Sequence, residues 1–292
     1  MPRHRIGFWY RLAAVLAKPP LVILFKRDWR GMENIPAHGG FITAINHNSY
    51  LDPLAYAHFQ YNTGRVPRFL AKSALFKVPV IGRMFHGLQL IPVYRESTDA
   101  ANAFRAAVSA IDKGECVAFY PEGTLTRDPD QWPMRAKTGA ARVALLTKAP
   151  VIPVAQWGAN AVLPPYAGAK RLRLFPRKTF KVVAGPPVDL SAYYGQEPTA
   201  EVLRAATDTI MAAVTELLAD VRQEPVPAGR AEQPKGGAAE GLGSADPTDH
   251  EADGTDHEAD GTGREAGRTK HEADRTGRGS GRTEHENEGN AT

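Results

Sequence analysis

Short apolar runs that alternate with helical patterns constrain the fold of this chain more than any other feature. Five runs have the length and composition of buried β-strands: 41–45 (FITAI), 88–93 (LQLIPV), 116–120 (CVAFY), 151–155 (VIPVA) and 180–185 (FKVVAG). Helical patterns lie between them, most clearly at 98–113, 136–148 and 199–222. This alternation predicts an α/β fold, in which a mostly parallel sheet is flanked by helices.

The charges divide the chain into a basic body and an acidic tail. Of its 36 Lys and Arg and 32 Asp and Glu residues, residues 224–292 hold 8 and 16. The tail therefore has a net charge of −8 and residues 1–223 a net charge of +12. A basic body suggests a polyanionic partner, such as a phosphate-bearing substrate, an anionic membrane surface or nucleic acid.

The tail is a repeat that does not predict a packed structure. Thr recurs every seven residues from Thr248 to Thr283, and TDHEADG occurs twice in succession. A coiled coil needs apolar residues at two positions of each heptad, and this repeat offers only an occasional Ala. We therefore predict a disordered tail over 224–292, and its four His residues give no reason to expect a metal site.

The first 30 residues are basic and then apolar, which raises the question of a membrane segment. Arg11, Lys18 and the Pro19-Pro20 pair interrupt the apolar run, so the pieces are too short to cross a bilayer. On a helical projection Phe8, Trp9, Leu12, Val15 and Leu16 share one arc, with cations beside it. We predict an amphipathic helix in the membrane interface over 1–30, with a helix packed on its own domain as the alternative.

Several familiar kinds of chemistry have no sequence support. Cys116 is the single cysteine and lies in an apolar run, so we expect a buried core residue and no disulfide. Cys–His metal-ligand spacing, GxGxxG and a Walker-type phosphate loop are absent from the sequence. We therefore expect neither a metal nor a nucleotide cofactor.

Polar residues follow the first predicted strand. Asn46, His47, Asn48 and Ser49 end the apolar run, and Asp52 comes five positions after His47. A His of near-neutral pKa is a natural general base for a hydroxyl, and a carboxylate can orient its ring. If a helix starts near Asn48 or Ser49, the loop can bring the two side chains together, although this spacing alone is a weak signal.

Two further strand ends carry matching chemistry. FYPEGTLTR (119–127) places Glu122, Gly123 and Thr124 in a turn, and LIPVYR ends in Arg95, whose guanidinium suits a phosphate. In α/β folds, functional groups gather at the carboxyl ends of strands. The set suits deprotonation of an alcohol on a phosphate-bearing substrate.

The chain resembles the glycerolipid acyltransferase family, in particular bacterial 1-acyl-glycerol-3-phosphate acyltransferases. The resemblance rests on four blocks in order, NHNSYLD, IPVYR, PEGT and VIPV (151–154), with AKSALFKVPVIG (71–82) between the first two. It covers about residues 30–190, so we assign an acyltransferase domain to 31–223.

The resemblance implies a role for each matching residue. His47 would deprotonate the free glycerol hydroxyl, and Asp52 would orient and stabilise His47. Substrate binding would fall to Arg95 at the phosphate, to Lys72 as a helper, and to Glu122, Gly123 and Thr124 around the acceptor. Asn46 joins this set as a substrate-binding candidate, although it could instead cap the following helix.

The implied reaction moves a fatty acyl group onto the sn-2 hydroxyl of lysophosphatidic acid and gives phosphatidic acid in phospholipid biosynthesis. The donor would be an acyl thioester of coenzyme A or acyl carrier protein, with no cofactor. Because acceptor and product live in a bilayer, we expect a peripheral or monotopic protein at the cytoplasmic face of the membrane. Cations at 68–83 are interleaved with apolar residues, which favours a membrane surface over nucleic acid.

One departure from the family pattern keeps alternatives open. Members commonly read PEGTRS, whereas this chain has Leu125 in place of that Arg and Arg127 two places later. Another lysophospholipid or a glycolipid is therefore an alternative acceptor, and a non-catalytic membrane adaptor is a second alternative. A hydrolase with Ser49 as nucleophile lacks the GxSxG pattern.

Overall fold

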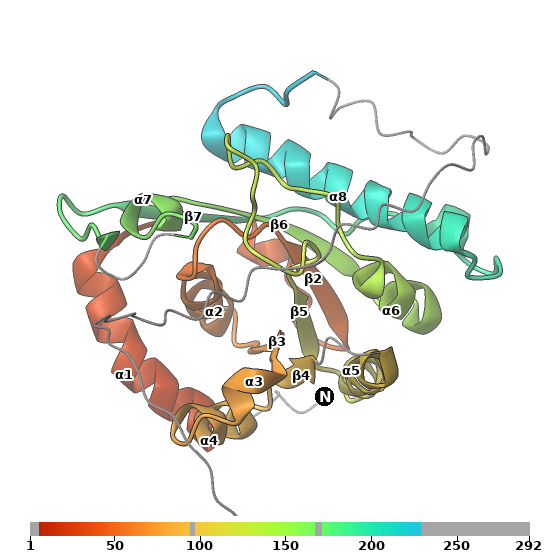
Figure 1. The fold of residues 1–292 in the computed structure, drawn as a ribbon, viewed down its shortest axis with the longest axis horizontal. Helices are drawn as coiled ribbons and strands as arrows, with labels where there is room; N and C mark the ends of the chain where they lie inside the picture. Colours follow the sequence, from red (N-terminus) through yellow and green to blue (C-terminus); the bar gives the residue numbers. More distant parts are fainter. Residues whose placement is uncertain (1–5, 94–96, 167–170, 229–292) are drawn as a thin grey trace, which may run out of the picture. The chain divides into compact units, whose positions relative to one another are not determined.

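The computed structural model describes residues 6–93, 97–166 and 171–228, all within one compact unit. Its sheet has seven strands in the order β1-β7-β6-β2-β5-β3-β4 (Figure 1). The strands are β1 Lys26–Arg30, β2 Phe41–Ile45, β3 Pro67–Lys72, β4 Ile91–Val93, β5 Cys116–Phe119, β6 Val151–Trp157 and β7 Thr179–Ala184.

Helices connect most of the strands. They are α1 Phe8–Leu24, α2 Asp52–Asn62, α3 Ser73–Phe76, α4 Ile81–Gly87, α5 Ser97–Asp112, α6 Gly139–Thr147, α7 Ala159–Val162 and α8 Ala200–Arg222. Two 3₁₀ turns, Met32–Asn34 and Ser191–Tyr193, complete the described elements.

Five strands run in the same direction and bring their carboxyl ends to one edge. β2 lies between β5 and β6 and is parallel to both, and β3 and β4 continue the parallel arrangement beyond β5. β7 is antiparallel to β6, and β1 is parallel to β7. The predicted α/β fold with a mostly parallel sheet is therefore confirmed, and we call the edge where β2, β3, β4, β5 and β6 end the carboxyl edge.

The central strand β2 is buried on both faces. Ile42 and Ala44 point into the core beneath α5, α6 and α8, whereas Phe41 and Ile45 point into the core that α2 covers. This period of two explains why FITAI is apolar throughout, since a parallel strand between two helical layers has no solvent face. Figure 1 shows α1, α2 and α4 on one side of the sheet and α5, α6 and α8 on the other.

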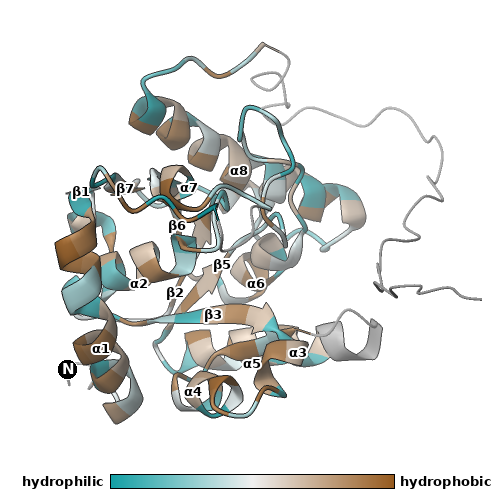
Figure 2. Ribbon diagram, turned by 60° about the vertical axis from the view of Figure 1, so that its left-hand side comes forward, coloured by the Kyte–Doolittle hydropathy of each residue, from teal (hydrophilic) through white to brown (hydrophobic). Residues whose placement is uncertain are grey.

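The N-terminal segment divides into a helix and a strand. α1 runs through Pro19 and Pro20 to Leu24, and β1 follows as an edge strand of the sheet. Apolar residues lie along α1 together with polar ones (Figure 2). Of the helices that the structure describes, none is long and apolar enough to cross a membrane.

Candidate active site

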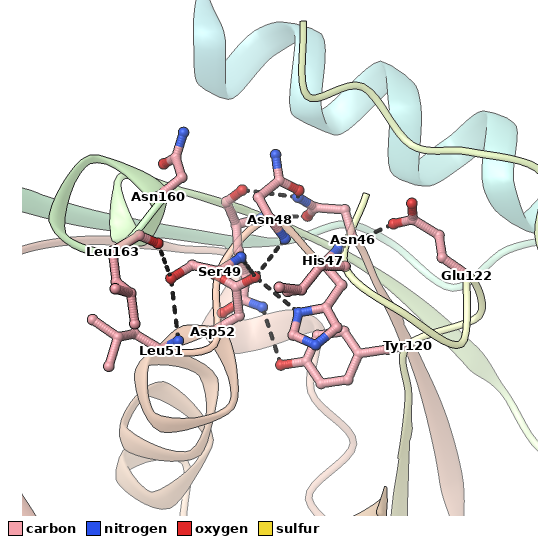
Figure 3. A network of polar contacts seen from close by, with 12 residues as sticks. Asn46, His47, Asn48, Ser49, Leu51, Asp52, Tyr120, Glu122, Asn160 and Leu163 are labelled. Carbon is pink, nitrogen blue, oxygen red and sulfur yellow. Dashed lines mark hydrogen bonds and ion pairs between the residues drawn. The ribbon is translucent and has the colours of Figure 1, made fainter. Parts of the chain in front are cut away.

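The loop between β2 and α2 brings His47 and Asp52 together, as Figure 3 shows. The ring Nδ1 of His47 lies 3.0 Å from Oδ2 of Asp52, whose side chain is 2% exposed. The same oxygen accepts hydrogen bonds from the backbone amides of Asn48 (2.6 Å) and Ser49 (2.7 Å). The helix begins at Asp52, three residues later than Ser49, so the tight turn and not the helix closes the distance.

This arrangement defines what the imidazole can do. Two backbone amides donate to Oδ2 of the buried Asp52 carboxylate and hold it in place. The same oxygen can accept the Nδ1–H of His47, and in that tautomer Nε2 is the nitrogen able to receive a proton. His47 is 15% exposed at its side chain, which leaves the ring accessible to a small reacting group.

Tyr120 stacks on the His47 ring. The two ring centroids are 4.2 Å apart with an angle of 27° between the planes, and the Tyr120 hydroxyl accepts a hydrogen bond from Nε2 of Gln156 (3.3 Å). Burial raises the pKa of the Tyr120 hydroxyl well above its usual value, and the charge of Asp52 raises it further. Tyr120 is thus a neutral platform that limits rotation of the imidazole.

Glu122 holds the backbone of His47. Its Oε1 accepts from the amide of His47 (3.1 Å) and its Oε2 from the amide of Met134 (3.0 Å), while the amide of Thr126 donates to the carbonyl of His47 (2.8 Å). Glu122 is 4% exposed. Its observed contacts are those of a brace between two loops, and substrate contact by Glu122 stays a prediction.

Asn46 supports the loop from inside the protein. Its Nδ2 donates to Oδ1 of Asn48 and to the carbonyl of Gln156, and its Oδ1 accepts from the amide of Gln156 (2.7 Å). Asn46 does not cap α2, because Leu51 holds that position and no side chain bonds there. It is fully buried and ties the end of β2 to β6, and substrate contact by Asn46 stays a prediction.

Three of the remaining predicted residues, Gly123, Thr124 and Lys72, lie at the carboxyl edge, in the loop after β5 or at the end of β3. Gly123 is exposed with a φ of +74° next to the Lys137 side chain, and Oγ1 of Thr124 lies 3.5 Å from the Tyr166 hydroxyl. Lys72 is exposed at the last position of β3. Arg95 lies outside the described residues, which resume at Ser97.

Among the described residues, two other candidate chemistries lack a suitable site. Ser49 is fully buried, and its hydroxyl donates to the carbonyl of Leu163 (2.8 Å), which disfavours its use as a nucleophile. In the part of the chain that the structure describes, no three His, Cys, Asp or Glu side chains form a group that could hold a metal ion.

Sequence reasoning missed Tyr120 and Gln156 because both act across strands. β2 and β5 pair Ala44 with Phe119, so the residues that follow each strand become neighbours. An aromatic residue directly before the PEGT turn was the available signal, but it required the strand order.

An α/β fold with a carboxylate-oriented His at its carboxyl edge is an arrangement that can remove a proton from a hydroxyl group. Comparison with known proteins indicates that the transferred group is an acyl group. A family model described as Acyltransferase matches residues 26–157. This matched part, slightly less than half of the chain, resembles acyltransferases.

Individual relatives agree with this family. The chain is 28% identical over 188 residues to a 1-acyl-sn-glycerol-3-phosphate acyltransferase of Bacillus subtilis, which covers 63% of this chain and 84% of the relative. A chloroplastic protein of the same name from Brassica napus is 28% identical over 164 residues, covering 56% of this chain. The chain spans only 46% of that plant relative's length.

A solved structure supports the fold. The crystal structure of the 1-acyl-sn-glycerophosphate acyltransferase PlsC from Thermotoga maritima matches with a TM-score of 0.55 and 23% identity. The match covers 75% of this chain and 81% of that chain.

Proposed function

We propose that the protein is a 1-acyl-sn-glycerol-3-phosphate O-acyltransferase, which moves a fatty acyl group from an acyl thioester to the sn-2 hydroxyl and gives phosphatidic acid. The oriented His47–Asp52 pair is the observation that carries the proposal. The names of the bacterial and plant relatives support the acceptor. Acyl-coenzyme A and acyl carrier protein thioesters are the two donor classes.

The chemistry follows from the atoms of the pair. Nε2 of His47 removes the proton of the acceptor hydroxyl as its oxygen attacks the thioester carbonyl carbon. The tetrahedral adduct then expels the thiolate, which takes the proton back from the imidazolium, so an ester bond forms and a thioester bond breaks. Asp52 holds the ring and stabilises its transient positive charge, and no covalent acyl-enzyme is needed.

Acceptor binding is assigned to the carboxyl edge. Arg95 would hold the phosphate with two parallel hydrogen bonds, with Lys72 as a helper. Gly123 and Thr124 would border the acceptor beside His47, whose backbone Glu122 braces. The net charge of +12 on residues 1–223 favours such an anionic substrate.

The same proposal includes the membrane. On α1, Phe8, Leu12, Val15, Leu16 and Ile23 are exposed, which is typical of a helix that lies in the interface of a bilayer. Peripheral binding at the cytoplasmic face would give the site access to a lipid acceptor.

A different lysolipid is the second candidate acceptor. Leu125, which stands in the place of the Arg in the PEGTRS pattern of the resembled family, is 3% exposed, so this position offers no cation to a headgroup. Arg127 is exposed two residues later. The adaptor alternative has less support, because the His47–Asp52 geometry is intact.

Thiol release tests the proposal. The protein is incubated with acyl-coenzyme A or acyl carrier protein thioester, with 1-acyl-glycerol-3-phosphate, another lysolipid or no acceptor. We expect release that requires 1-acyl-glycerol-3-phosphate and falls about 10²- to 10⁴-fold in His47→Ala. His38→Ala, an exposed His before β2, is the matched control and keeps full activity. Full turnover by His47→Ala would refute the mechanism, and release only with other lysolipids would replace the acceptor.

Arg95→Ala tests the phosphate assignment. Loss of charge-assisted hydrogen bonds worth about 1.5–3 kcal/mol should raise the KM for a phosphate-bearing acceptor about 10- to 100-fold with a smaller change in kcat. Arg142→Ala, an exposed Arg on α6, is the control. An unchanged KM in Arg95→Ala would remove Arg95 from the site.

A further inference from the structure

We propose that residues 73–87, the α3–α4 segment, form a second membrane-binding element that docks on an anionic lipid surface beside α1. The proposal rests on the proposed function only in that the acceptor is a lipid. It adds a surface that α1 does not provide.

The α3–α4 segment exposes several large apolar side chains to solvent. The exposed set is Leu75, Val78, Val80, Ile81 and Met84. Val80, at the turn between the helices, is 79% exposed, more than any other large apolar side chain that the structure describes. A cluster of this kind on a protein surface marks an interaction site, because burying it removes apolar area from water.

The charges around this apolar cluster are positive, which favours an anionic partner. The sequence from 53 to 95 contains six Lys and Arg residues and not one Asp or Glu. Arg65 is buried and Arg68 pairs with Glu115, so neither faces outward freely. Lys72, Lys77 and Arg83 are exposed around the apolar side chains. Each Lys or Arg near an anionic bilayer contributes about 1 kcal/mol, so this surface fits anionic lipid.

The α3–α4 segment packs directly against α1. Gly87 at the end of α4 lies against the Trp9 indole so closely that an added Cβ would stand 2.5 Å from the ring. Figure 1 shows α4 next to the N-terminal half of α1, and Figure 2 shows hydrophobic residues on both. The sequence of α1 and its approach, residues 1–27, also lacks Asp and Glu. Both elements can therefore meet the same lipid surface.

The α3–α4 segment also lies at the edge of the sheet that carries the site. α3 begins directly after β3, and His47 follows β2, which is parallel to β3 through β5. Docking of Val80 and its neighbours would bring this carboxyl edge close to the lipid. A lipid acceptor could then reach His47 without leaving the interface.

Site-specific labelling tests the contact. Val80→Cys is labelled with an environment-sensitive fluorophore, and the single native cysteine, Cys116, is 1% exposed and does not compete. With vesicles of phosphatidylcholine and about one third phosphatidylglycerol we expect a blue shift and quenching by brominated acyl chains. Leu146→Cys on α6, 61% exposed, is the matched control and shows neither. A Val80→Cys label that stays in water while a Val15→Cys label enters the bilayer would overturn the proposal.

A charge-insertion variant gives a second readout. Val80→Asp combined with Ile81→Asp should weaken binding to the same vesicles at least about tenfold, with Leu146→Asp as control. All variants are made in the His47→Ala background, so the result is independent of the proposed acyl transfer. Thermal melting checks that the variants fold, because both side chains are exposed. Unchanged vesicle binding, or equal binding to pure phosphatidylcholine, would overturn the proposal.

Discussion

At the scale of residues, His47 is held from three directions. Asp52 bonds to its ring, Tyr120 stacks on its face and Glu122 accepts from its backbone amide. These partners come from the β2–α2 turn and from the loop after β5. A general base must keep its geometry within a fraction of an ångström, so in the proposed mechanism Tyr120 and Glu122 serve to hold His47 in position.

Two substitutions of Tyr120 separate the effect of its ring stacking from the effect of its hydroxyl. Tyr120→Phe keeps the ring and loses only the hydrogen bond from Gln156, so we expect kcat within about threefold of the native value. Tyr120→Leu removes the flat surface and frees the imidazole, and we expect kcat to fall about tenfold or more with little change in KM.

Steady-state kinetics of the two variants, with melting curves for both, measure the difference. A purely structural role would lower stability in Tyr120→Leu and leave kcat per folded molecule intact. Equal kcat in the two variants, after correction for folding, would therefore remove Tyr120 from the list of positioning residues.

The residues of the site were predictable only where the signal was local. His47 and Asp52 are five positions apart, and this spacing led to the hypothesis of a paired base and carboxylate. In the structure their side chains lie 3.0 Å apart. Glu122 was visible in its motif, but its bond to the amide of His47 depends on the pairing of β2 with β5. Asn46 could not be interpreted from sequence, because its partner Gln156 is 110 positions away.

At the scale of elements, the loop 125–136 is clamped to α8. Arg222 lies between the Trp132 and Trp157 rings, 4.3 and 4.4 Å from their centroids, and donates to the carbonyl of Asp130 (2.7 Å). In the same loop, the carbonyl of Gln131 accepts from Nδ2 of Asn48 (2.8 Å). α8 therefore stabilises the loop next to His47 from outside the site.

Arg222→Ala should loosen this loop. Loss of two cation–π contacts, the hydrogen bond to the carbonyl of Asp130 and the ion pair with Glu224 should cost about 2 kcal/mol of unfolding free energy and lower the Tm by roughly 5 °C. Arg222→Lys keeps the charge without the planar stack and should fall between the two. Differential scanning calorimetry measures the change, with Arg142→Ala as an exposed control on α6. A Tm equal to that of the control would show that the stack does not support the loop.

Elements were predictable where their patterns were strong. The five apolar runs all became strands, and 98–113 and 199–222 match α5 and α8 within a residue or two. β1 and β3 were missed, because KRDWR and PRFLAK carry charges that suit one edge strand and one strand with a partly exposed face. These two segments become strands because β1 pairs with β7 and β3 pairs with β5, and not because their local sequence favours a strand.

At the scale of the whole molecule, the boundary between body and tail decides what can be removed. The sequence predicts a disordered tail over 224–292, of which 229–292 lie outside the described residues. Val226 lies within the predicted tail, yet it packs against the cluster of Trp132, Leu218 and Val221. The backbone amide of Glu224 also donates to the carbonyl of Ala219 (3.1 Å) and closes the end of α8.

Two truncations distinguish the composition boundary from the packing boundary. A chain that ends at Ala228 keeps Val226 and the closing bond of α8, so we expect an unchanged Tm and an unchanged rate with detergent-dispersed acceptor. A chain that ends at Gln223 loses both, and we expect a loss of about 1–2 kcal/mol of unfolding free energy. Val226→Asp in the full chain should reproduce this loss, because it places a charge on the apolar cluster. If the chain that ends at Ala228 were the unstable one, the repeat tail would contribute to the fold despite its composition. Equal stability of both truncations would instead return the boundary to residue 223.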